Sequence, residues 1–96
     1  MRLFRAISPA ERLALNVFGI LTAGPSSCEG KHFATTLEHA RAWGQKLPIE
    51  GFIVLEVEIE AVDVLYFISE NLDMIGPAYF LDEKHFDMCK IVTIHE

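Results

Sequence analysis

Residues 52–60 constrain the fold more than any other stretch of the chain, because two sets of side chains alternate along them: Ile53, Leu55, Val57 and Ile59 alternate with Val54, Glu56, Glu58 and Glu60. A strand points successive side chains to opposite faces, so this alternation predicts a strand with one buried face. The other face carries Glu56, Glu58 and Glu60. Such a row of carboxylates is typical of a solvated sheet face, which we favour; the alternative is a cation site or acid–base chemistry.

The chain before this strand predicts a short first strand over residues 3–7, followed by a helix. Ser8 is placed to cap that helix, Pro9 falls at its first position, and Glu11 completes the pattern of a capping box. Apolar residues then recur at helical spacing, and Gly19 is expected to end the helix.

A second strand is predicted over residues 32–35, and a second helix begins with Thr35 or Thr36 as its cap. One face of that helix carries Leu37, Ala40, Gly44 and Leu47. Residues 61–71 fit either a helix or a strand, Gly76-Pro77 predicts a turn, and residues 90–95 predict a closing strand. Helices come early and long strands late, which favours an α+β sheet over a doubly wound parallel one.

Length and charge limit the function classes. A chain of 96 residues forms one domain, over residues 1–96, and 51% apolar residues suffice for a globular core. The formal charge of −6 repels phosphate backbones, so nucleic acid is an unfavoured partner. No stretch is long and apolar enough to span a bilayer. Two cysteines without CxxC spacing indicate reduced thiols and a cytoplasmic protein.

The histidines and cysteines give little sign of chemistry. The four histidines lack the close paired spacing of zinc ligands, so we expect no metal site. Cys28 lies in a predicted loop, where nothing nearby would lower its pKa, and is interpreted as an unreactive thiol. Cys89 adjoins an apolar strand and is expected in the core.

Arg5 is the one charged residue within the first predicted strand. Two interpretations stay open. The spacing favours the solvent face, whereas the guanidinium fork is suited to hold a phosphate or carboxylate.

Several blocks of the sequence, in order, resemble small ADP-ribosyltransferase-like domains of bacterial polymorphic toxins. LFRAISPAE at residues 3–11 is similar to their "YRAVSPAE" opening, and residues 24–36 resemble their "GP.S.EGK.FA.T" block. Residues 38–44 fit "E.A..WG", and residues 54–59 resemble the "VVEVEV" strand. Residues 75–78 resemble the "GIGPA" turn.

The resemblance implies a split, mostly antiparallel sheet with two or three helices and a cleft that grips NAD. It assigns NAD binding to Arg5 on the first strand and to Phe33 and Thr35 in the second motif. A late acid would stabilise the positive charge that develops on the ribose. Relatives tend to read "GPARYAE" in this last motif, whereas this chain places Asp82 at the glutamate position and Glu83 one residue later.

The implied function is that of an ADP-ribosyltransferase or NAD glycohydrolase of bacterial toxin type, with NAD as substrate. Asp82 and Glu83 are the candidate catalytic acids. A target or an immunity protein is the expected macromolecular partner. The alternative is a catalytically degenerate domain of the same fold that binds a protein or a ligand.

Overall fold

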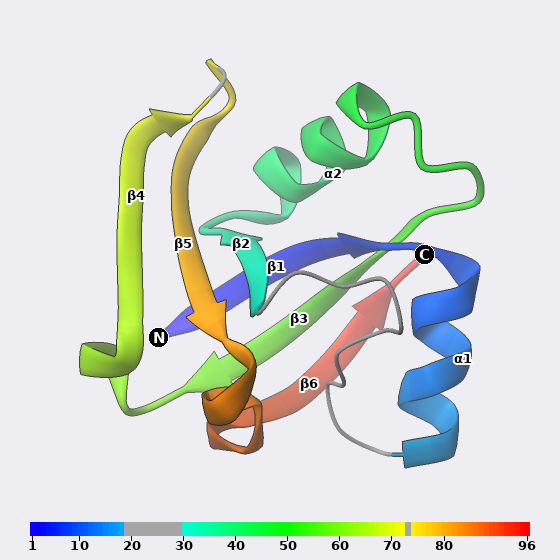
Figure 1. Ribbon diagram of the computed structural model, residues 1–96. Helices are drawn as coiled ribbons and strands as arrows, with labels where there is room; N and C mark the ends of the chain where they lie inside the picture. The colour runs from blue at the N-terminus through cyan, green and yellow to red at the C-terminus, as the bar shows by residue number, and fades with distance from the viewer. Residues whose placement is uncertain (19–29, 73) are drawn as a thin grey trace.

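The computed structural model describes residues 1–18, 30–72 and 74–96 (Figure 1). Its centre is a six-stranded sheet in the order β4-β5-β2-β1-β3-β6, in which every neighbouring pair is antiparallel. The strands are β1 (Arg2–Ile7), β2 (Gly30–Ala34), β3 (Ile53–Ile59), β4 (Leu65–Leu72), β5 (Gly76–Asp82) and β6 (Cys89–His95). The predicted α+β class is therefore confirmed.

Two α-helices and two short 3-10 helices complete the described chain. They are α1 (Pro9–Phe18), α2 (Leu37–Lys46), η1 (Val62–Val64) and η2 (Glu83–Met88). The predicted caps are present: the Glu11 backbone N–H donates to Ser8 Oγ over 3.2 Å, and the His39 N–H donates to Thr36 Oγ1 over 3.1 Å. Thr36, and not Thr35, is therefore the cap of α2. Among the described residues, no helix is long and apolar enough to cross a membrane.

The sheet is divided between β1 and β2. These two strands share a single residue pair, Phe4 with Ala34, whereas β1 pairs with β3 along its whole length from Arg2 to Ile7. β2 is likewise paired along its whole length with β5. The sheet thus consists of two three-stranded halves that are joined at one residue pair.

Each face of the sheet has its own apolar cluster. The larger one gathers strand residues around Phe33, with Leu15 from α1 and Phe86 from η2. Its fully buried strand members are Leu3, Ile7, Leu55, Val57, Ile59 and Leu81. On the opposite face α2 packs Ala40 against Ala34 and Val54. The two helices therefore cover opposite faces.

Gly44 lets α2 approach the start of β3. A Cβ atom built at this position would lie 2.5 Å from Phe52 Cδ2, which is far inside van der Waals contact. The predicted face of this helix is thus partly correct: Ala40 and Gly44 are buried, but Leu47 is exposed.

The second half of the chain differs most from the sequence prediction. The ambiguous residues 61–71 form η1 and most of β4, and the predicted turn at Gly76-Pro77 is the start of β5. The acidic face of β3 is also not simply solvated. Glu56 is bonded to Arg2 and lies 2.7 Å from His95 Nε2, contacts that hold the pKa of Glu56 below its usual value.

Candidate functional site

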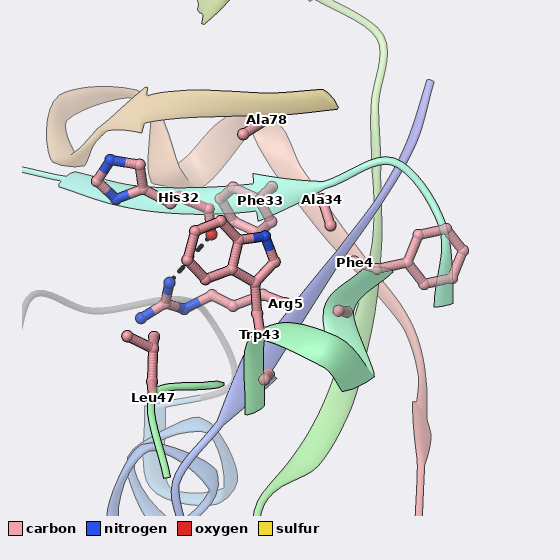
Figure 2. A pocket seen from close by; sticks show the side chains of 10 residues that line it. Phe4, Arg5, His32, Phe33, Ala34, Trp43, Leu47 and Ala78 are labelled. Atoms are coloured by element: carbon pink, nitrogen blue, oxygen red, sulfur yellow. Dashed lines mark hydrogen bonds between the residues drawn. The ribbon is translucent and has the colours of Figure 1, made fainter. Parts of the chain in front are cut away.

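A pocket of about 410 Å³ lies at the junction of β1, β2 and α2 (Figure 2). Its lining residues come from both halves of the sheet and from the helix that covers them. They are Phe4, Arg5, Ala6, His32, Phe33, Ala34, Ala40, Trp43, Leu47 and Ala78. The volume falls in the range typical of small-molecule sites. Four of the lining residues are alanines, whose short side chains leave the hollow between the larger groups unfilled.

Arg5 is held firmly at the edge of this pocket. Its Nε donates to Glu11 Oε2 over 3.0 Å, and its Nη2 donates to Glu11 Oε1 over 3.2 Å. Its Nη1 donates to the His32 carbonyl oxygen over 3.0 Å, the bond drawn dashed in Figure 2. The guanidinium therefore bridges the two strands where their backbone pairing stops. These bonds use three of the five guanidinium N–H groups, so two are left for a ligand.

Lys31 adds a second cation next to Glu11. Its side chain is buried, its Nζ lies 3.3 Å from Glu11 Oε1, and it stands over the Phe86 ring. Burial lowers the pKa of Lys31 below its usual value. Burial alone would raise the pKa of Glu11, but the hydrogen bonds and charges of Arg5 and Lys31 outweigh it and lower that pKa.

The edge of the pocket at Arg5 is rich in positive charge, although the chain as a whole is acidic. Arg5 and Lys31 face one carboxylate, Glu11, in a chain whose formal charge is −6. Partial burial and the charge of Arg5 both lower the pKa of His32 below its usual value, which favours the neutral imidazole. The site therefore combines a cationic edge with a neutral ring that can donate or accept a hydrogen bond.

The rest of the pocket is aromatic and apolar. Phe4 lies at one end, and Figure 2 shows the Trp43 and Arg5 side chains reaching into the same space. The His32 ring packs edge-on against Phe80, with 5.2 Å between the ring centroids. Such surroundings are suited to a planar ring that carries an anionic or hydrogen-bonding group.

The structure brings together two of the five residues assigned from the resemblance. Arg5 and Phe33 line the pocket, whereas Thr35 follows the end of β2 and is not part of the lining. Asp82 and Glu83 are also outside the lining. Asp82 ends β5 and caps η2, where its Oδ1 accepts a 3.3 Å hydrogen bond from the Lys84 N–H; Glu83 is exposed on η2.

Strand alternation nevertheless distinguishes the two acids. In the β2–β5 pairing Phe80 is opposite His32, and Asp82 is opposite Gly30, two residues further along. Residues two apart on a strand share a face, so Asp82 is on the pocket's side of the sheet, about 7 Å beyond Phe80. Glu83 belongs to η2 and has no such relation to the pocket.

Sequence reasoning missed several residues of the site. The sequence pattern assigns Glu11 only to a helix cap, and Lys31 and Trp43 only to the resembling blocks. It gives His32 a place in a predicted strand and among four histidines that lack zinc-ligand spacing. Trp43, the single tryptophan of the chain, was the one available signal. No group of three or more potential metal ligands occurs within the described ranges, and Cys28 lies outside them.

Comparisons with protein-family models, with curated proteins and with solved structures find no match.

Proposed function

We propose that this domain binds NAD in the pocket at the division of the sheet. The observation that carries the proposal is the placement of Arg5 at the pocket edge. Glu11 and the His32 carbonyl hold its guanidinium, and two of its N–H groups are left for a ligand. NAD offers a flat aromatic ring, a carboxamide and a pyrophosphate, which suit Trp43, His32 and Arg5 respectively. The resemblance to ADP-ribosyltransferase-like domains supports NAD over other nucleotides.

The proposed chemistry is cleavage of the nicotinamide–ribose bond, with transfer of ADP-ribose to an acceptor or to water. NAD is larger than the pocket, so one part of a bound molecule would extend along the sheet. Asp82 shares the pocket's face beyond His32 and Phe80, which favours it over Glu83 as the acid beside the developing ribose cation. The alternative is a domain that binds without cleavage, favoured by the absence of both acids from the pocket lining.

The binding proposal is tested by titrating NAD while following the melting temperature and the heat of binding. NAD should raise the melting temperature, because a ligand of the folded state stabilises it. Arg5→Lys keeps the charge beside Glu11 but loses the fork, and it should weaken binding roughly tenfold or more. Arg12→Lys is the matched control, because Arg12 pairs with Glu96 at an exposed site and does not line the pocket. Equal weakening by both variants would remove Arg5 from this role.

Release of nicotinamide separates the enzyme from the simple binder. With activity, Asp82→Asn should lower the release rate by roughly 10²-fold or more, while NAD affinity changes little. Glu83→Gln should leave the rate near that of the wild type. NAD binding without nicotinamide release would instead identify a degenerate binding domain.

A further inference from the structure

The β4–β5 hairpin presents an open edge that the proposed NAD site does not use. β4 is the first strand in the sheet order, and β5 is its only strand partner in the described sheet. Figure 1 shows the two strands forming one side of the molecule, with β4 outermost. The outer edge of β4 therefore carries backbone N–H and C=O groups that no strand of the described chain pairs.

The side chains along this edge are unusually apolar for an exposed strand. Tyr66 is 58% exposed, Phe67 is 53% exposed, and Ile68 is also exposed. Tyr66 packs on Phe80 on one face, and Phe67 packs edge-on against Tyr79 on the other. Both faces of the edge thus offer aromatic surface.

The opposite edge of the sheet carries an exposed lysine, which β4 lacks, and a register irregularity lies along its pairing. β6 carries Lys90 among its exposed residues, and its pairing with β3 is interrupted by a bulge at Glu56 and Val57. Lysines and bulges are devices that prevent strands from pairing at an edge. In β4 the register with β5 is regular through Phe67, and the irregularities come after it. The first part of β4 is therefore the more open template for a further strand.

Charge determines which strand would fit there. Residues 61–83 contain five acidic residues and no Lys, Arg or His, so they account for −5 of the formal charge of −6. Asp63 and Glu70, both exposed, stand before and after the aromatic residues. A second β4 would place two such segments against each other, and phosphate-rich surfaces would be repelled.

We infer that β4 is the docking edge for an extended, lysine- or arginine-rich segment of a partner protein. That segment would pair with the free edge of β4 as an added strand. Its apolar side chains would cover Tyr66 and Phe67, and its cations would lie near Asp63 and Glu70. The backbone bonds supply affinity, and the charges select the partner.

A pair of synthetic peptides of the same length as β4 tests this inference. One alternates lysine with valine, and the other alternates glutamate with valine. Titration of the isotope-labelled chain with the lysine peptide should shift backbone amide signals concentrated in β4. The glutamate peptide should leave them in place, and high salt should weaken the lysine peptide's binding.

Matched variants at the two edges locate the contact. Replacing Tyr66 and Phe67 by threonine keeps strand propensity and should weaken the lysine peptide roughly tenfold. The control replaces Ile91 and Val92 of β6, which are also exposed, by threonine and should have no effect. Glu70→Lys should weaken binding roughly fivefold.

Three outcomes would overturn the inference. They are equal binding of the two peptides, amide shifts that fall on β6 or nowhere, and sedimentation showing a dimer that the Tyr66 and Phe67 replacements dissociate. The last result would identify a second copy of the chain as the occupant of the edge.

Discussion

At the scale of the residue, the buried Cys89 makes the stability of the fold depend on pH. The thiol is free, it lies in the larger apolar cluster as the sequence predicted, and burial raises its pKa from 9.0 to about 11. Between these two values the folded thiol keeps its proton while the unfolded thiol loses it. Ionisation therefore lowers the free energy of the unfolded state relative to that of the folded state as pH rises through this window.

We expect the free energy of unfolding to fall by roughly 2–3 kcal/mol between pH 9 and pH 11 because of this single group. Cys89→Ala removes the thiol, so its stability should decline less steeply over the same range. Urea unfolding at several alkaline pH values measures both slopes. Parallel slopes for the two proteins would show that the thiol is not the source of the decline.

At the scale of the element, the stability of α2 depends on the cap at its first turn. The helix has ten residues, a length at which an isolated helix is marginal, and it supplies Ala40 and Trp43 to the pocket. Thr36 is in extended conformation and accepts the His39 N–H, which satisfies one of the backbone donors left free at the helix start.

Thr36→Ala should therefore lower the free energy of unfolding by about 1 kcal/mol, and Thr36→Ser should restore most of it. Thr35→Ala is the matched control, because the neighbouring threonine does not cap the helix. Chemical denaturation of the three variants distinguishes them. A larger loss from Thr35→Ala than from Thr36→Ala would contradict the assignment of the cap.

At the scale of the whole molecule, Glu11 ties three elements together. It stands in α1 and holds Arg5 of β1 and Lys31 of β2, so it links the two halves of the sheet from one side. Removing the carboxylate would leave Lys31 as a buried cation with its principal partner gone.

Glu11→Gln should cost roughly 3 kcal/mol of unfolding free energy near neutral pH. Because the folded pKa of Glu11 is lowered, its contribution is present above the unfolded value of 4.5 and is lost as pH falls through the folded value. The difference between variant and wild type should accordingly shrink in acid. Denaturation curves at neutral pH and at increasingly acidic pH test this, and a difference that is constant with pH would argue against an ionic role.

The sequence by itself determined the elements whose signals are local. The alternation along residues 53–59, the Ser8 and Pro9 start of α1, and the early order of the helices all depend on neighbours within a few residues. It also marked Arg5 as unusual, although it favoured the solvent face. The bidentate contact with Glu11 overturns that preference. The Arg5 side chain is half-buried because the Glu11 carboxylate, six residues later on α1, pairs with its guanidinium.

Only the tertiary structure decided the rest. Residues 65–72 and 76–82 are strands because they pair with each other. The Gly76-Pro77 dipeptide predicts a turn, and the local sequence gives no sign that a paired strand begins there. The pocket exists because β1 and β2 pair at one point and then part, which places His32, Trp43 and Ala78 around Arg5. These residues are far apart in the sequence, and they are close in space only because of the strand order. Sequence spacing therefore could not have predicted that they share a pocket.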